Sequence, residues 1–459
     1  MGIQHCQRPI FGIQWHPESI CSAYGNAITS NFREVVLDFW HVNSPWNLWS
    51  RRSVRTNASL SQKLMDESAI VNEAIQASPP APQIPALAES LPYYVKAVDL
   101  GKGIHPRHLF EKFVRGSTSD GEAWLDSAKV NDVYSRNSYL AAAAFAISYS
   151  TRTRKLSFYR DNKLLGTEKL QDSYWSWLDK FQKNDIQNNI HAIPANLLGQ
   201  ETEAGQSILQ VGLIGYFGYE LKRESLPGYV FIPSSSEDEG SQRDAHLIFA
   251  DRVLWLDNYT QSWKAFGLLR RGSADPIATA VGSKSPVGMT EAEFTNYVKS
   301  IQLSFAQSSF SCQVKPVPLA EFTPIDNEET YTVSVQAARA AIREGESYEL
   351  TLTTKFRALS SANTDPYALY LSLRSRNPAP YSAYLNFPIF DLAILSSSPE
   401  RFISIDRSGV VEMKPIKGTV AVSPDKEENM RRINHLQTDT KELAENLMVR
   451  NIATSIVSF

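Results

Sequence analysis

An uninterrupted apolar run, Tyr-Leu-Ala-Ala-Ala-Ala-Phe-Ala-Ile-Ser-Tyr at residues 139–149, constrains the fold more than any other segment. It is about half as long as the ~20 residues that a membrane-spanning helix requires, so it predicts a buried strand. Alternating or short apolar patterns at residues 93–100, 155–160, 208–219 and 247–256 predict further strands, and Asp161-Asn162 predicts a hairpin turn. The chain is therefore organised around a β-sheet.

Length, charge and cysteine content exclude several classes of protein. A chain of 459 residues is long enough for two or three domains, and its net charge of -3 gives no reason to expect nucleic-acid binding. We expect no membrane span. The cysteines Cys6, Cys21 and Cys312 are too few and too scattered for a disulfide framework or a zinc site, which suits a reducing compartment. A cytoplasmic location is the expectation.

Residues 395–420 hold the densest set of reactive side chains. Two short strands are predicted at residues 402–405 and 410–413, joined by an Asp-Arg-Ser-Gly turn and followed by Pro-Ile-Lys-Gly-Thr. Lys417 is a nucleophile only if its amine is held neutral, and Glu400 offers a carboxyl group for proton transfer. Gly418 would let a ligand approach the main chain, and Thr419 adds a hydroxyl group. The alternative is that Lys417 is a surface lysine before a turn glycine, which would have the same local sequence.

Three motifs in this order resemble one family. Ser-Ser-Ser-Pro-Glu-Arg-Phe at residues 396–402, Pro-Ile-Lys-Gly-Thr at 415–419 and Lys-Glu-Leu-Ala-Glu-Asn-Leu-Met at 441–448 resemble the chorismate-utilising enzymes, which include the anthranilate, isochorismate and aminodeoxychorismate synthases. The lysine between isoleucine and glycine, where anthranilate synthases carry alanine, favours the fused aminodeoxychorismate synthases. The resemblance implies that Lys417 attacks chorismate at C2 while Glu400 protonates the departing C4 hydroxyl, and that ammonia then enters at C4.

The resemblance also implies a metal site. Glu442 and Glu445, three residues apart, would share one face of a helix predicted from residue 425 to about 451, and both acids stand where relatives hold Mg²⁺ against the chorismate carboxylate. A solvated ion pair between Lys441 and Glu445, four residues apart, is the alternative from the residues alone.

The first 40 residues resemble the end of a class I glutamine amidotransferase. A strand leading into Trp-His-Pro-Glu-Ser would give His16 the role of deprotonating a cysteine and Glu18 that of orienting the imidazole. No cysteine stands upstream on a glycine-flanked turn, so glutamine hydrolysis by this chain is not expected. The fold class implied is α+β, an antiparallel-sheet-rich and partial chorismate-utilising fold, preceded by this remnant of an α/β amidotransferase domain.

Five segments are predicted in chain order. They are the amidotransferase remnant (1–40), a proline-rich linker (41–90), a domain like the N-terminal region of anthranilate synthase component I (91–270), a linker or insertion with a helix at about 291–304 (271–325), and the first part of the chorismate-binding domain (326–459). The last begins with an amphipathic helix at residues 331–343, whose apolar side chains are expected to lie against a sheet.

Two segments resemble those that line a tryptophan site in relatives, namely Leu-Asp-Ser at 125–127 and Asn-Pro-Ala-Pro-Tyr at 377–381. The residues concerned are Ser127, Pro378 and Tyr381, and the sequence leaves tryptophan binding open. Glycines at every third position of residues 212–218 indicate close packing between strands rather than a dinucleotide fingerprint.

The family pattern is lost after Val449, where relatives continue with further strands and ligands. We therefore expect strands without partners, exposed apolar surface, and an isolated polypeptide that is unstable and has little activity. The expected function is that of an aminodeoxychorismate synthase acting on chorismate and glutamine-derived ammonia. The alternatives are anthranilate synthase component I and a non-catalytic relic that binds tryptophan or a partner.

Overall fold

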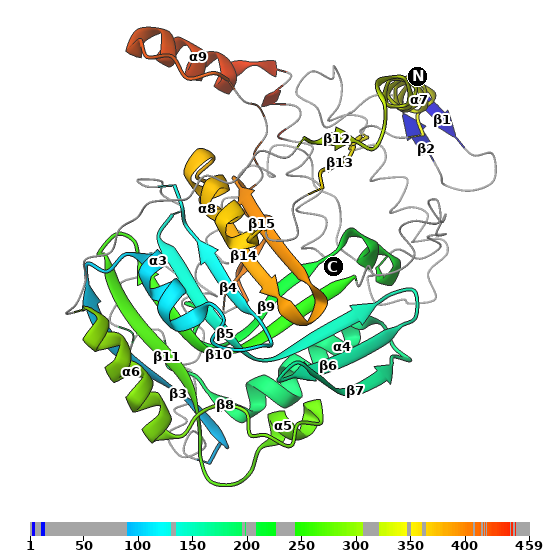
Figure 1. The fold of residues 1–459 in the computed structure, drawn as a ribbon. Coiled ribbons are helices and arrows are strands. Elements are labelled where there is room, and N and C mark those ends of the chain that lie inside the picture. Colours follow the sequence, from blue (N-terminus) through cyan, green and yellow to red (C-terminus); the bar gives the residue numbers. More distant parts are fainter. Residues whose placement is uncertain are drawn as a thin grey trace, which may run out of the picture. The chain divides into compact units, whose positions relative to one another are not determined.

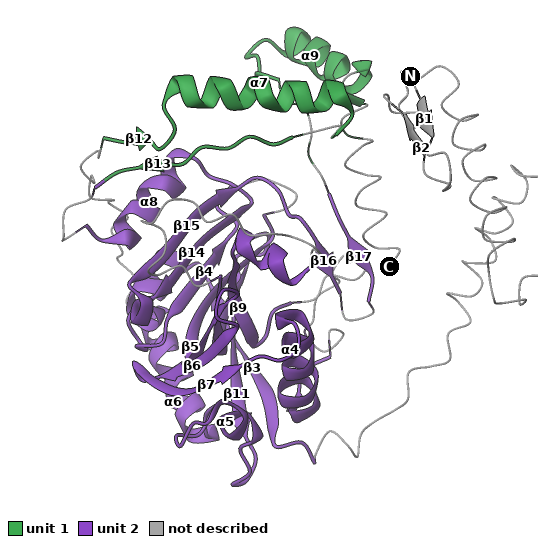
Figure 2. Ribbon diagram, turned by 90° about the vertical axis from the view of Figure 1, so that its right-hand side faces the viewer, with its two compact units in different colours: residues 1–85, 321–358, 415–459 green, residues 86–320, 359–414 purple. Residues whose placement is uncertain are grey.

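A computed structural model describes residues 2–4, 11–13, 90–129, 135–194, 198, 208–225, 244–305, 321–346, 350–359, 364–406, 409–414, 416, 418, 420–440, 442–443 and 446. The chain divides into two compact units that are interleaved along the sequence (Figure 2). Unit 1 comprises residues 1–85, 321–358 and 415–459, and unit 2 comprises residues 86–320 and 359–414. Each unit is described by itself.

Unit 2 is built on an 11-stranded sheet (Figure 1). Its strands are β3 (Tyr93–Lys102), β4 (Glu122–Asp126), β5 (Asn137–Ser150), β6 (Lys155–Arg160), β7 (Lys163–Lys169), β8 (Ile190–His191), β9 (Gly212–Phe217), β10 (Ala245–Asp257), β11 (Ser262–Arg270), β14 (Tyr381–Phe387) and β15 (Leu392–Ser398). The main order is β15-β14-β4-β5-β10-β11-β3-β8, with β6 and β7 extending from β5 and with β9 on β10. Among these described pairings, only β3 with β8 is parallel.

The two long central strands, β5 and β10, explain why the apolar run is continuous. In the first half of β5, alternate residues enter different hydrophobic clusters: Leu140 and Ala142 join one, and Ala141 and Ala143 join the other. Because successive side chains of a strand point to opposite faces, both faces of the sheet are buried here. The predicted buried strand is confirmed, and it extends from Asn137 to Ser150.

Five α-helices lie within the described residues of unit 2. They are α3 (Pro106–Leu109), α4 (Tyr174–Lys180), α5 (Pro276–Val281), α6 (Glu291–Phe305) and α8 (Pro366–Arg376). Short 3-10 or π-helical turns occupy Phe110–Val114, Phe181–Ile186, Gln187–Asn189, Tyr219–Glu224 and Pro388–Phe390. Helix α6 packs against β3 and β11, and α8 packs against β14 and β15. The helix expected at about 291–304 is therefore confirmed as α6.

Predictions from local sequence signals were confirmed at one turn and one glycine, and were less accurate for one strand. The hairpin between β6 and β7 turns at Asp161 and Asn162, whose φ angles are 51° and 60° as a primed turn requires. The strand predicted at 208–219 is shorter than expected, since β9 ends at Phe217 and a 3-10 turn follows. The predicted close packing of the glycines is found at Gly215, where a methyl group would overlap the main chain of His246.

Unit 1 contains small elements within the described residues. They are β1 (Gly2–Gln4) paired with β2 (Phe11–Ile13), β12 (Thr323–Pro324) paired with β13 (Phe356–Arg357), α7 (Glu328–Glu344) and α9 (Lys426–Thr438). The amphipathic helix predicted at 331–343 exists as α7, but its expected burial is wrong: none of its residues is buried, and Val333 is 58% exposed. The two-stranded sheet β12–β13 is itself exposed and is too small to cover it.

No helix within the described residues is both long enough and apolar enough to cross a membrane.

Candidate functional site

The predicted reactive residues are divided between the two units. Glu400 lies in unit 2, on the exposed segment between β15 and β16, whereas Gly418 and Glu442 lie in unit 1. Lys417, Thr419 and Glu445, together with His16 and Glu18 of the amidotransferase-like segment, lie outside the described residues. The geometry of the candidate site is therefore built from two separate halves.

The half in unit 2 is a hairpin that follows Glu400. Strands β16 (Ser404–Ile405) and β17 (Val411–Glu412) pair antiparallel with Ser404 opposite Glu412 (Figure 2). The Asp406 carboxylate accepts a hydrogen bond from the Val410 N–H at 2.9 Å, and Gly409 has φ of 84°, which glycine adopts without strain. The hairpin is as predicted, but both strands are shorter than the sequence indicated.

The backbone of Glu400 is held close to the end of β15. The Ser398 hydroxyl donates to the Glu400 carbonyl at 3.0 Å, and the Glu400 N–H donates to the same hydroxyl oxygen at 3.4 Å. The next residue, Arg401, forms an ion pair with Glu412 on β17. The segment that carries Glu400 is thus fixed on both sides.

Glu412 lies between two cations. Its second carboxylate oxygen is 2.8 Å from Nζ of Lys414, and the first is paired with the Arg401 guanidinium. The hydrogen bond from Lys414 and the positive charges of Lys414 and Arg401 hold the pKa of the Glu412 carboxyl below its ordinary value. Arg401 directly follows Glu400, and Lys414 stands three residues before Lys417. The ion pairs of Glu412 therefore involve residues close in sequence to both predicted reactive groups.

The half in unit 1 brings Gly418 against Glu442. Gly418 has φ of 78°, and a methyl group on its Cα would overlap the Glu442 carboxylate and contact Leu436 of α9. The positive φ favours glycine at this position, and any larger residue would also require the Glu442 side chain to move. The structure therefore places a carboxylate directly beside the main chain of the Pro-Ile-Lys-Gly-Thr segment.

A helix break sets the position of Glu442. One continuous helix was expected from residue 425 to about 451, but α9 ends at Thr438 and Asp439 has an extended ψ of 124°. The Asp439 carboxylate accepts from the Glu442 N–H at 3.1 Å, and its carbonyl accepts from the Leu443 N–H. Asp439 thus caps a new helical turn that carries Glu442, as an N-terminal aspartate commonly does.

The described residues contain no group of three or more His, Cys, Asp or Glu side chains arranged to hold a metal ion. The chemistry of Glu442 nevertheless fits a hard divalent cation, since its carboxylate oxygens are the ligand type that Mg²⁺ prefers. Its predicted companion, Glu445, is outside the described residues. The magnesium site stays a prediction.

The two segments of the predicted tryptophan-like site do meet in unit 2. The Ala128 N–H donates to the Ala379 carbonyl at 3.1 Å, and Ser382, next to Tyr381, pairs with Asp126 across β14 and β4. The Ser127 hydroxyl donates to the Asn137 carbonyl at 2.7 Å. Pro378 immediately precedes Ala379 in the sequence. Tryptophan binding itself stays a prediction.

A buried ion pair lies directly beside these segments. The Asp126 carboxylate, 4% exposed, accepts from the Tyr370 hydroxyl at 3.0 Å and from the Arg374 guanidinium. Arg374 also lies 5.2 Å from the centre of the Trp124 ring. Burial, together with the neighbouring Asp126 charge, raises the pKa of Tyr370. Asp126 and Arg374 therefore satisfy each other within the chain.

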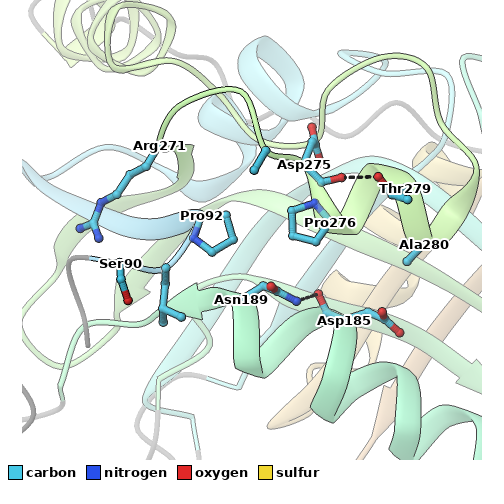
Figure 3. A pocket seen from close by; sticks show the side chains of 11 residues that line it. Ser90, Pro92, Asp185, Asn189, Arg271, Asp275, Pro276, Thr279 and Ala280 are labelled. Atoms are coloured by element: carbon cyan, nitrogen blue, oxygen red, sulfur yellow. Dashed lines mark hydrogen bonds between the residues drawn. The ribbon is translucent and has the colours of Figure 1, made fainter. Parts of the chain in front are cut away.

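A cavity of about 850 Å³ opens elsewhere in unit 2 (Figure 3). It lies between the beginning of β3, the turns at residues 185–189 and helix α5, and none of the predicted site residues lines it. The Asp275 carboxylate in its wall already accepts from Tyr93, Ala278 and Val287, and Arg271 lies over the Tyr94 ring. These groups serve the fold, and we assign the cavity no function.

Sequence reasoning missed two residues of these sites, Glu412 and Arg374. Glu412, at the end of β17, and Lys414 stand two residues apart just before the Pro-Ile-Lys-Gly-Thr segment, and in an extended chain that spacing is a usable signal for a shared face. Arg374 carries no local signal, because its partner Asp126 is 248 residues away in sequence.

Comparison with known proteins assigns the chain to a family. A family model described as "chorismate binding enzyme" matches residues 135–457, and one described as "Glutamine amidotransferase class-I" matches residues 1–35. The chloroplastic aminodeoxychorismate synthase of Arabidopsis thaliana is 28% identical over 98% of this chain and 50% of its own length.

Two further relatives differ in how much of the chain they cover. The aminodeoxychorismate synthase of Streptomyces griseus is 27% identical over 98% of this chain and 54% of its own length. Anthranilate synthase component 1 of Acetivibrio thermocellus is 30% identical over 52% of this chain and 45% of its own length. The chain spans about half the length of the curated relatives it matches. Since the first family model covers well over half of the chain, the chain belongs to the chorismate binding enzymes.

Proposed function

We propose that this chain is the chorismate-converting part of an aminodeoxychorismate synthase, which replaces the C4 hydroxyl group of chorismate with an amino group. One observation carries the proposal: aminodeoxychorismate synthases align over 98% of the chain, whereas anthranilate synthase components align over 52% to 55% of it. Lys417, which stands where anthranilate synthases carry alanine, supports the same choice. The product would serve p-aminobenzoate and folate synthesis.

The proposed chemistry assigns a nucleophile and an acid. The neutral Lys417 amine forms a bond to C2 of chorismate, the ring double bonds shift, and the C4 hydroxyl leaves as water with a proton from Glu400. Ammonia then forms a bond at C4, the double bonds shift back, and the C2–nitrogen bond to Lys417 breaks. The net change is chorismate plus ammonia to aminodeoxychorismate plus water.

Substrate contacts are proposed for the residues around Lys417. Gly418 exposes its main chain beside Glu442, and Thr419 supplies a hydroxyl group. Glu442 and Glu445 would hold Mg²⁺, whose positive charge would neutralise the chorismate carboxylate. The observation in favour is the carboxylate of Glu442, which lies so close to Gly418 that an added methyl group would displace it.

The source of nitrogen is proposed to be ammonia released from glutamine. The match of residues 1–35 to class I glutamine amidotransferases supports this, with His16 and Glu18 as the base and its orienting carboxylate. We propose the cytoplasm as the location because the cysteines are few and scattered, as in proteins of reducing compartments.

The test is to incubate the purified chain with chorismate, Mg²⁺ and ammonium, and then with an aminodeoxychorismate lyase. We expect p-aminobenzoate above the level given by the Lys417→Ala variant, even where turnover is slow. Anthranilate formed without the lyase would favour the anthranilate synthase alternative. Equal product from the Lys417→Ala variant would contradict the proposed chemistry.

A further inference from the structure

We infer that Glu412 is a positioning residue for the proposed acid Glu400, acting by clamping Arg401 to strand β17. The inference rests on the proposed function in that Glu400 is taken as the proton donor. It concerns only residues of unit 2 that the structure describes. The role inferred for Glu412 is exerted through Arg401 and not through contact with the substrate.

The first support is the path of the chain around Glu400. Between the end of β15 at Ser398 and the start of β16 at Ser404, five residues lie outside any regular element. The N-terminal side of this segment is fixed by the two contacts between Ser398 and Glu400, at 3.0 and 3.4 Å. A second attachment, on the C-terminal side of Glu400, would hold this segment from the other direction.

The second attachment is the ion pair between Arg401 and Glu412. Arg401 immediately follows Glu400, and the side chains of Arg401 and Glu412 are 25% and 45% exposed, so water reaches the pair. Glu412 lies in β17 opposite Ser404, and its position is therefore set by the hairpin ladder. A charge-assisted hydrogen bond from a guanidinium to such a carboxylate restricts direction as well as distance. Glu400 is thereby held from both sides.

Lys414 completes the arrangement. Its Nζ lies 2.8 Å from the Glu412 carboxylate oxygen that does not pair with Arg401. The Glu412 side chain therefore links Arg401, which follows Glu400, to Lys414, which precedes the Pro-Ile-Lys-Gly-Thr segment. Exposed ion pairs of this kind contribute little to global stability. Their effect is expected on the placement of a reacting group, where a displacement of about 1 Å can lower a rate ~100-fold.

The experiment compares Glu412→Gln with a matched control, Glu291→Gln. Glu291 is likewise an exposed glutamate of unit 2 with two partners, Lys96 and Tyr94, but it lies on α6. Amide hydrogen exchange of residues 398–406 and turnover of chorismate with ammonium are measured for both variants and the parent chain. In the parent, turnover above that of the Lys417→Ala variant establishes the proposed function separately.

We expect Glu412→Gln to speed exchange at residues 398–406 several-fold and to lower kcat roughly tenfold with KM nearly unchanged. The Glu291→Gln control is expected to change neither quantity. A double variant, Arg401→Glu with Glu412→Arg, is expected to recover part of the lost kcat, which a general loss of folding would not allow.

The outcomes separate the two claims. Unchanged exchange in Glu412→Gln overturns the clamp, whatever the turnover. Faster exchange with unchanged kcat overturns the link to Glu400. If the parent chain shows no turnover but Glu412→Gln exchanges faster than the parent, the clamp is supported and only the proposed function is contradicted.

Discussion

Helices α6 and α7 have similar lengths and similar amphipathic patterns, but they end in opposite environments. Helix α6, with 15 residues in unit 2, buries Phe294, Val298 and Ile301, whereas α7, with 17 residues in unit 1, buries none. The difference lies in what each helix meets: α6 packs on β3 and β11 of the large sheet. An apolar stripe thus predicts a helix, but burial depends on a partner surface elsewhere in the chain.

The same contrast holds between the described parts of the two units. Unit 2 contains two hydrophobic clusters on opposite faces of its sheet. In unit 1, none of the residues whose burial is described, all within 321–358 and 415–459, is buried, and Phe322, Val333 and Phe356 are each more than half exposed. Since apolar burial is the main favourable term in folding, the stability of the chain is expected to reside in unit 2.

The largest expected effect is a difference in amide hydrogen exchange between the units. Amides in the middle of β5 and β10 are expected to exchange slower than those of α7 by several orders of magnitude, because α7 can open without exposing a core. Exchange followed by mass spectrometry measures this for each segment. Protection of α7 equal to that of β10 would remove the contrast.

A core substitution in unit 2 is expected to have the next largest effect. Phe249 is fully buried and stacks on Phe145 with ring centres 5.0 Å apart, so Phe249→Ala should lower the free energy of unfolding by about 3–5 kcal/mol. The matched change in unit 1, Val333→Ala, should cost less than about 0.5 kcal/mol. Urea unfolding measures both. Equal costs would show that unit 1 has a core of its own.

A substitution at Gly418 tests whether the proximity of Gly418 and Glu442 in unit 1 matters for the proposed reaction. Gly418→Ala introduces a methyl group that overlaps Glu442, and we expect chorismate turnover to fall roughly tenfold or more. Gly345→Ala is the control, because Gly345 also has a positive φ, 81°, but has nothing within 4 Å of an added Cβ. Equal losses in both variants would assign the effect to backbone strain alone.

The smallest expected effect concerns a buried carboxyl in unit 2. Asp251 stands at an irregularity in the pairing of β10 with β5, and burial raises the pKa of its carboxyl. A raised folded-state pKa means that stability is lost as the pH rises from the unfolded pKa through the folded one. Asp251→Asn should therefore raise the free energy of unfolding by about 1 kcal/mol at neutral pH.

Urea unfolding at several pH values measures the Asp251 effect. The gain from Asp251→Asn should shrink as the pH falls toward the ordinary pKa of an aspartate, where the carboxyl is protonated in both states. A loss of stability at neutral pH would mean that the pairing with Arg252, at 3.3 Å, outweighs the cost of burial.

The sequence predicted elements whose signals are local. The apolar run of β5, the Asp161-Asn162 turn and the helix α6 all follow from residues within the element itself. The order of the sheet does not: β14 pairs with β4 across more than 250 residues, with Ser382 opposite Asp126, and no local pattern encodes that partner. The break at Asp439 was missed because helix periodicity continues through a residue that caps a new turn.

The candidate site was predicted in part for the same reason. Motif order predicted Glu400, Gly418 and Glu442 as site residues, and their roles stay predictions; the proximity of Gly418 and Glu442 is a feature of the fold that the spacing alone left open. The ion pairs of Asp126 with Arg374 and of Glu412 with Arg401 depend on tertiary pairing, so only the structure revealed them.

The most direct test of the proposed chemistry is a search for the covalent intermediate on Lys417. The chain is incubated with chorismate and Mg²⁺ in the absence of ammonia, and the peptide that contains residues 415–419 is analysed by mass spectrometry. The account predicts an addition equal to chorismate less one water on Lys417, which disappears when ammonium is added. Turnover with ammonium that yields aminodeoxychorismate, but with no such adduct and with full activity in Lys417→Ala, would contradict it.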